Sequence, residues 1–273
     1  MKSITLITFF FFQSISALTI HKDVADIKEV QEIIEESNIS NFFSNETLIV
    51  FDIDNTVLAM KKSLGSDQWF NWKARDLKAQ NKEINNLLDW QKTLFDLSQM
   101  RLTEWDLPFV IDELQNEYKV IALTSRSPKS RVATQRELSR HLIDFERSSI
   151  GQAFRGSFIP LGQTRKASYE NGIMMTSGMH KGEMLIYLVK EIYNGEFPFS
   201  QVIFIDDHLK NTRRVFDSLK QLGIQIASLR YAKEDLRVKQ FKNSFEEKLQ
   251  CDLELLDLRE KMIEIFNHAP GII

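Results

Sequence analysis

The feature that most constrains the fold is an apolar run that ends in two acidic residues. Residues 48–51 read Leu-Ile-Val-Phe and lead into Asp52 and Asp54, after which Asn55 and Thr56 break the pattern. Continuous branched and aromatic residues predict a strand buried on both faces, as in a parallel sheet covered by helices. Open α/β sheets bind ligands at the C-terminal ends of their strands, so the carboxylates stand where a cation and a substrate can meet. Taken alone, such a pair is more often an edge acid and a turn or helix-capping residue.

Further apolar runs predict that this strand belongs to a parallel sheet. Residues 119–123, 202–205 and 224–229 are strand-like, and segments with helical spacing of apolar residues separate them. Strands that alternate with helices are typical of an α/β fold with helices on both faces of the sheet. An Asn-Gly pair at 171–172, between two β-compatible runs, predicts a hairpin.

Chemically useful side chains follow three of the predicted strands. They are Asp52 and Asp54, Thr124, and Asp206 with Asp207, while Lys181 begins the helix before the last strand. The C-terminal ends of parallel strands lie on one edge of a sheet, so these residues can converge. Together they offer a nucleophile, an acid/base, a hydroxyl donor and a cation, which phosphoryl transfer requires. Mg²⁺ prefers carboxylate, water and substrate oxygens, and Asp52 and Asp206 can supply the carboxylates.

Each of these residues also has a plainer interpretation when it is taken separately. Thr124 is able to cap the next helix, Lys181 to be a solvated charge, and residues 206–207 to form a turn at the end of a strand. The ordered set on successive strand ends favours a site over three separate coincidences.

In this order, the residues resemble the motifs of the haloacid dehalogenase (HAD) superfamily over about residues 46–231. Segments 65–70, 122–126, 180–185 and 205–208 resemble, more narrowly, an uncharacterised HAD-type family of bacterial proteins. The resemblance implies a Rossmann-like parallel sheet flanked by helices. A small helical cap is expected after the first motif strand, at about residues 59–108.

The resemblance also implies roles for the site residues. Asp52 is the expected nucleophile that forms an aspartyl-phosphate, and Asp54 protonates the leaving group and later activates water. Thr124 and Lys181 hold the phosphoryl group. Mg²⁺ is expected on Asp52, Asp206 and the backbone carbonyl of Asp54.

Other residues around these motifs are candidates for substrate contacts or for supporting roles. Asp207 is expected to orient Lys181 or a metal-bound water. Arg126 either contacts phosphate or pairs with a carboxylate, and the sequence leaves both possibilities open. Ser125 and Asn211 lie close to the motifs and complete this group.

All four tryptophans fall in the predicted cap. Trp69 and Trp72, with Asp67 and Gln68, follow the nucleophile closely enough to roof the site and to favour aromatic phosphates. Tryptophans at helical spacing more often form the core of a cap, so both interpretations stand.

Composition excludes several other classes of protein. A net charge of −3 provides no basic field for nucleic acid or a membrane surface. The single cysteine, Cys251, excludes an internal disulfide and a cysteine-rich zinc site, and is expected to be an inert buried thiol. His141, His180 and His208 are too scattered for a zinc motif.

The first residues predict export. Lys2 precedes an uncharged, phenylalanine-rich run, and Ser14, Ser16 and Ala17 provide small residues for cleavage. An uncleaved membrane anchor is the alternative. We expect a signal peptide (1–17), an N-terminal helical segment (18–45), a catalytic domain (46–235) and a C-terminal helical tail (236–273).

The sequence therefore predicts a Mg²⁺-dependent phosphomonoester hydrolase in the periplasm or outside the cell. Its substrate is expected to be a small phosphate ester or a phosphopeptide, with no membrane contact after cleavage of the signal. A catalytically silent binding or effector protein and a phosphotransferase are the alternatives. The oligomeric state is left open.

Overall fold

The computed structural model describes residues 19–39, 44–152 and 154–271. One sheet has the strand order β1-β10-β9-β2-β5-β8-β7-β6. Pairing is parallel from β1 through to β8 and antiparallel along β8-β7-β6, which confirms the predicted α/β fold. The strands are β1 (Ile20–Val24), β2 (Thr47–Phe51), β5 (Lys119–Thr124), β6 (Gly156–Phe158), β7 (Ala167–Glu170), β8 (Ile173–Met175), β9 (Gln201–Asp206) and β10 (Gln225–Tyr231).

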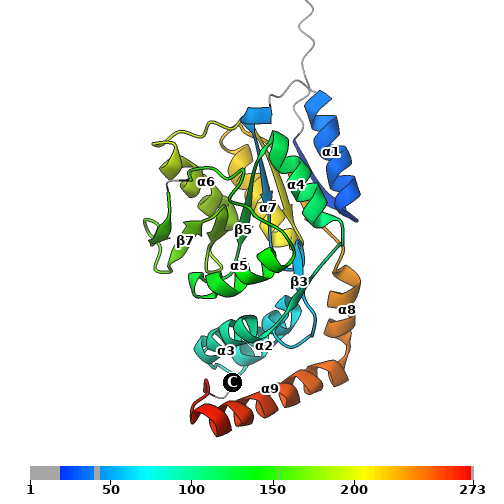
Figure 1. Cartoon of the computed structure of the whole chain (residues 1–273), viewed down its shortest axis with the longest axis vertical. Coiled ribbons are helices and arrows are strands. Elements are labelled where there is room, and N and C mark those ends of the chain that lie inside the picture. Colours follow the sequence, from blue (N-terminus) through cyan, green and yellow to red (C-terminus); the bar gives the residue numbers. More distant parts are fainter. Residues whose placement is uncertain (1–18, 40–43, 153, 272–273) are drawn as a thin grey trace, which may run out of the picture.

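Helices cover both faces of this sheet, as the apolar runs predict (Figure 1). Ile49 and Phe51 of β2 pack in one core cluster with α1, α4 and α5, whereas Leu48 and Val50 pack in a second cluster with α6 and α7. Alternate residues of one strand thus serve opposite faces. The helices are α1 (Ile27–Ile39), α4 (Leu107–Glu117), α5 (Arg131–Arg140), α6 (Lys181–Ile192) and α7 (Leu209–Lys220).

The Asn-Gly pair forms the predicted hairpin between β7 and β8. Asn171 and Gly172 have φ values of 51° and 71°, the left-handed conformations that a tight hairpin turn requires. A Cβ atom at Gly172 would lie 2.1 Å from the carbonyl oxygen of Phe145, so a side chain is excluded there.

The segment before the nucleophile contains a strand as well as a helix. Residues 18–45 were predicted to be helical, so this is a correction. Strand β1 precedes α1 and extends the sheet by pairing with β10. This edge strand has one neighbour and carries the polar residues His21, Lys22 and Asp23. It therefore lacks the apolar pattern that identifies interior strands.

The predicted cap is an insertion between β2 and β5. It contains α2 (Asp67–Ala79) and α3 (Asn85–Leu97), between the short antiparallel strands β3 (Leu58–Met60) and β4 (Met100–Leu102). These strands were not predicted, because three residues are too few to show a period. They pair as a separate two-stranded sheet and so bring the two ends of the insertion together.

The C-terminal helices pack on the cap and do not form a separate tail. In Figure 1, α9 (Phe245–Phe266) runs beneath α2 and α3, and α8 (Asp235–Asn243) leads into it. Phe241, Cys251 and Leu255 share one apolar cluster with cap residues that include Trp69 and Trp90. Cys251 is a buried free cysteine, as predicted, and burial raises the pKa of its thiol to about 12.

Within the described residues, no helix is both long and apolar enough to cross a membrane. The predicted signal peptide lies outside the described residues.

Candidate active site

Three adjacent strands bring the predicted site residues to one edge of the sheet. The C-terminal ends of β9, β2 and β5 carry Asp206, Asp52 and Thr124, all of which are buried. The Asp52 amide donates to the carbonyl oxygen of Ile205 at 2.8 Å, which ties the end of β2 to β9. Residues far apart in sequence thus meet here, as the parallel topology predicts.

A tight turn after β2 positions Asp54. The amides of Val57 and Leu58 both donate to the carbonyl oxygen of Ile53, at 3.0 and 2.9 Å. Asn55 takes up the left-handed conformation that this turn needs, with φ of 58°, and asparagine tolerates it better than most residues. The Asn-Thr break in the sequence is therefore the turn that follows the acidic pair.

Lys181 lies between two carboxylates. Its Nζ donates to Asp52 Oδ1 at 2.5 Å and to Asp206 Oδ2 at 2.6 Å, and its side chain is 1% exposed. Burial favours the neutral amine, but the two carboxylates outweigh it and raise the pKa of Lys181 above its usual value. The lysine is therefore a permanent cation in the centre of the site.

Gly182 allows the lysine to reach this position. A Cβ atom there would lie 2.5 Å from Ser218 Oγ and 2.7 Å from the carbonyl oxygen of Arg214, both on α7. Only a residue without a side chain lets the first turn of α6 approach α7 so closely.

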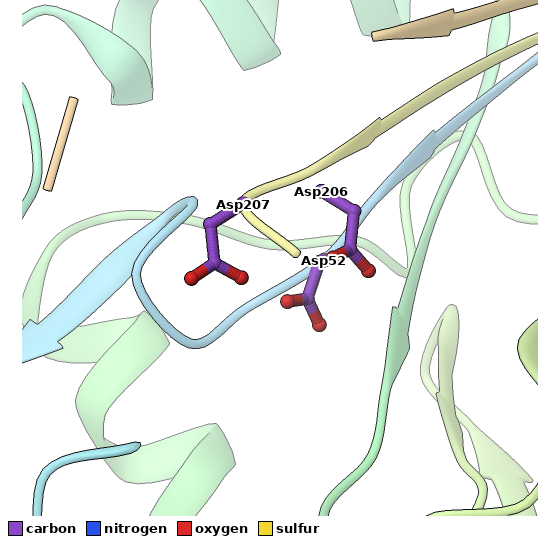
Figure 2. Close-up of side chains that lie close together, drawn as sticks. All are labelled: Asp52, Asp206 and Asp207. Carbon is purple, nitrogen blue, oxygen red and sulfur yellow. The ribbon is translucent and has the colours of Figure 1, made fainter. Parts of the chain in front are cut away.

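Asp52, Asp206 and Asp207 form a carboxylate cluster that can hold a metal ion (Figure 2). One oxygen from each lies within 4.8 Å of the others. Burial, and then the neighbouring carboxylates, raise the pKa of Asp207 well above its usual value. Burial raises the pKa of Asp52 as well, against the opposing effect of Lys181. One lysine does not balance three carboxylates, so the donor set fits a divalent cation.

The sequence interpretation placed Asp207 outside the metal ligands, whereas the structure brings its carboxylate into the cluster. The side chain of Asp54 is not part of this cluster, and its predicted metal contact was the backbone carbonyl.

Neighbouring polar residues hold the two acids at the end of β9. Asn211 Nδ2 donates to both oxygens of Asp206 at 3.1 Å. The Asp207 amide donates to Thr56 Oγ1 at 3.0 Å, and Asn55 Nδ2 lies 3.4 Å from Asp207 Oδ2. Asn55 and Thr56 had no predicted role, although they follow the acidic pair directly.

Arg126 pairs with Asp54 in a two-pronged ion pair. Its Nε donates to Asp54 Oδ2 at 2.9 Å and its Nη2 to Asp54 Oδ1 at 2.8 Å. The sequence left two roles open for Arg126, contact with phosphate and pairing with a carboxylate, and the structure shows the second. Its amide donates to Thr124 Oγ1 at 3.2 Å, and Ser125 between them is exposed.

Trp69 and Trp72 belong to the core of the cap. Trp69 is completely buried in the cluster that includes the C-terminal helices, and Trp72 packs edge-on to Phe241 with ring centroids 6.1 Å apart. Of the two interpretations considered for them, the structure favours cap core over a roof for aromatic substrates.

Asp67, at the start of α2, is the cap residue most affected by the site. Its half-buried position and the charges of Asp54 and Asp206 raise the pKa of Asp67 to about 7. A cap carboxylate therefore interacts electrostatically with the carboxylates at the edge of the sheet.

The fold and the site define a Rossmann-like α/β protein with a capped, acidic, lysine-bridged candidate active site. Residues 23–261 match the family described as "Protein of unknown function (DUF2608)", and the chain belongs to that family. No curated protein matches its sequence.

Several solved structures resemble this fold. One is a HAD family enzyme from Bacteroides thetaiotaomicron, as the wild-type protein in complex with magnesium and inorganic phosphate. It aligns with a TM-score of 0.37 and 10% identity, covering 67% of this chain and 94% of that chain. The magnesium complex of the same enzyme aligns with a TM-score of 0.36 and 9% identity, over 68% and 93% of the two chains.

Proposed function

We propose that the protein is a magnesium-dependent phosphomonoester hydrolase of the HAD type that works through Asp52. The observation that supports this most is the position of Lys181 Nζ, 2.5 Å from Asp52 and 2.6 Å from Asp206. A fixed cation beside a buried carboxylate at the end of a strand is suited to bind a phosphoryl dianion for attack by that carboxylate.

The residues divide the reaction into two displacements. In the first, a carboxylate oxygen of Asp52 attacks phosphorus and the bond to the leaving oxygen breaks, while Asp54 gives its proton to that oxygen. In the second, Asp54 takes a proton from water, whose oxygen attacks the aspartyl-phosphate. Inorganic phosphate then leaves and Asp52 is restored.

The surrounding groups orient the phosphoryl group and balance its charge. Thr124 Oγ1 accepts from the Arg126 amide, an arrangement that leaves its hydroxyl hydrogen to donate to a phosphoryl oxygen. Lys181 neutralises part of the charge that develops there. Asp52, Asp206 and Asp207 would hold magnesium, which supplies the additional positive charge that carboxylates and phosphate together require.

The decisive variant is Asp52→Asn, because an amide of nearly the same shape cannot attack phosphorus. Hydrolysis of an aryl phosphate in the presence of Mg²⁺ should fall by more than about a thousandfold, while the unfolding temperature shows that the fold is retained. Asp257→Asn, on the exposed surface of α9, is the matched control and should leave the rate unchanged. Near-normal turnover by the Asp52 variant would contradict the aspartyl-phosphate mechanism.

The same assay distinguishes the two alternatives. Added alcohols that accept the phosphoryl group would show a phosphotransferase. A wild-type protein that binds phosphate but releases none from its esters would be a silent binding protein.

A further inference from the structure

We propose that Arg126 positions Asp54 for proton transfer to the leaving group and connects this acid/base to the cap. The inference rests on the proposed function, and it assigns to Arg126 the orientation of the acid/base rather than contact with phosphate.

Each of the three guanidinium nitrogens of Arg126 donates a hydrogen bond to another group of the protein. Its side chain is 2% exposed, and two of its nitrogens hold both oxygens of Asp54. Nη1 donates to Thr134 Oγ1 at 2.8 Å, on α5. Because the guanidinium is planar and rigid, anchoring its third nitrogen to the core also fixes the direction of the two bonds to Asp54.

Two further contacts of the Arg126 guanidinium come from the cap insertion. The guanidinium carbon lies 4.2 Å from the centroid of the Phe95 ring, on α3, and Nη2 lies 3.1 Å from Met100 Sδ, on β4. One side chain therefore touches the acid/base, the core and the insertion.

The junction between α3 and β4 is in turn fixed to α5. Arg136 donates to the carbonyl oxygens of Phe95, Asp96 and Ser98, and Glu137 accepts from the Met100 amide at 2.8 Å. A displacement of this junction would displace Phe95 and Met100 against Arg126, and the rigid ion pair would transmit it to Asp54.

The two roles considered for Arg126 predict different kinetics. Proton donation matters most when the leaving oxygen is strongly basic, as in an alkyl phosphate, and least for 4-nitrophenyl phosphate, whose leaving group departs as a stable anion. Asp54 also activates water in the second displacement, which both esters share, so kcat includes that step, whereas kcat/KM reports the first displacement alone. A residue that orients the proton donor should therefore lower kcat/KM for the alkyl ester selectively. A residue that contacts phosphate should affect both esters alike and weaken inhibition by inorganic phosphate.

The experiment compares Arg126→Ala and Arg126→Lys with the wild type on both esters. We expect kcat/KM for the alkyl ester to fall by about a hundredfold in Arg126→Ala and by less than about tenfold for the nitrophenyl ester. Inhibition by inorganic phosphate should be unchanged. Arg126→Lys keeps the positive charge but cannot donate to both oxygens of Asp54 at once, so its activity on the alkyl ester should lie between that of Arg126→Ala and the wild type. If Arg126→Ala does not fold, Arg126→Lys takes its place in the comparison.

Arg131→Ala is the matched control. Arg131 is also buried, but it donates to carbonyl oxygens of the β7-β8 hairpin and has no contact with the acid pair among its described hydrogen bonds. Its loss should leave the ratio of the two kcat/KM values unchanged. Phe95→Leu tests the connection to the cap and should reproduce the selective loss in weaker form.

The outcomes separate this inference from the function on which it rests. A wild type that hydrolyses neither ester overturns the proposed function and the inference with it. An active wild type whose Arg126 variants lower kcat/KM for both esters equally, or resist inhibition by phosphate, overturns the inference alone. A Phe95→Leu variant with the wild-type ratio overturns the connection to the cap.

Discussion

Trp69 shows how the environment of one residue changes its expected role. From sequence it was a candidate roof for aromatic substrates, but the whole side chain is buried among helices of the cap and the C-terminus. Its contribution is then mainly to stability, because a fully buried indole removes a large apolar surface from water.

Trp69→Ala should lower the free energy of unfolding by about 3–5 kcal/mol, because it leaves a large cavity in the cap core. Activity should fall on small and bulky phosphates alike, in proportion to the loss of folded protein. Trp105→Ala is the control, since Trp105 is 77% exposed and its loss should change stability by less than about 0.5 kcal/mol. Urea unfolding followed by circular dichroism measures both. A stable Trp69 variant with raised KM for aromatic esters alone would restore the substrate-roof hypothesis.

At the scale of elements, α5 fixes the end of the cap through Glu137. This carboxylate is buried and accepts from the Met100 amide and from Arg136 Nε. Burial alone would raise its pKa, but these two partners and Arg140 reverse the effect and hold the pKa of Glu137 below its usual value. A depressed pKa means that folding favours the ionised carboxylate. The stability that ionised Glu137 adds to the folded protein is therefore fully present at neutral pH, and it is lost as the pH falls through the folded-state pKa.

Glu137→Gln should therefore destabilise the protein at pH 7 by about 1–3 kcal/mol, the range for a hydrogen bond to a buried charged group. The difference from wild type should shrink as the pH falls below about 4, where the wild-type carboxylate is protonated as well. Thermal unfolding of both proteins at each pH measures this, with the exposed Glu113→Gln as a neutral control. A difference that is the same at both pH values would mean that the charge of Glu137 is not what stabilises the junction.

Helix α9 is a second element whose role depends on its packing. Leu255 is 6% exposed and packs in the cap cluster, whereas its neighbour Leu256 is 47% exposed. Leu255→Ala should cost about 2–5 kcal/mol, because it opens a cavity between the C-terminal helix and the cap. Leu256→Ala should cost less than about 0.5 kcal/mol. Equal and small effects in urea unfolding would show that α9 is a dispensable tail.

On the scale of the whole molecule, the site is assembled from segments separated by most of the chain. The insertion between β2 and β5 shares one apolar cluster with the helices after β10, so both ends of the described chain contribute to one packing unit. The charge balance at the sheet edge is also a property of the assembled fold. Asp52, Asp206 and Asp207 come together only when β2 lies beside β9.

Because this cluster carries excess negative charge, Mg²⁺ should stabilise the folded protein as well as activate it. The unfolding temperature should rise with Mg²⁺ concentration, since a ligand that binds only the folded state stabilises it by mass action. Asp206→Asn should lose most of this rise. Calorimetric scans with added Mg²⁺ and with a chelator measure it independently of activity. Full activity and an unchanged unfolding temperature after exhaustive chelation would contradict the metal site.

The sequence by itself predicted the interior parallel strands of the sheet and the residues at their C-terminal ends. The apolar runs before Asp52, Thr124 and Asp206 predict buried strands from local composition, and a parallel sheet necessarily places the ends of such strands on one edge. Lys181 could be predicted because the resemblance to known motifs identifies the helix on which it lies. These conclusions need only local pattern and chain order.

Only the tertiary structure decided how the remaining side chains are paired. Helix α9 carries apolar residues on a buried side, such as Cys251, and on an exposed side, such as Leu256, so its sequence does not show which side packs or on what. Arg126 has equally plausible partners in a phosphate and a carboxylate, and its choice of Asp54 depends on the turn after β2 and on contacts with α5. Such pairings follow from distances between remote segments, which local periodicity does not encode.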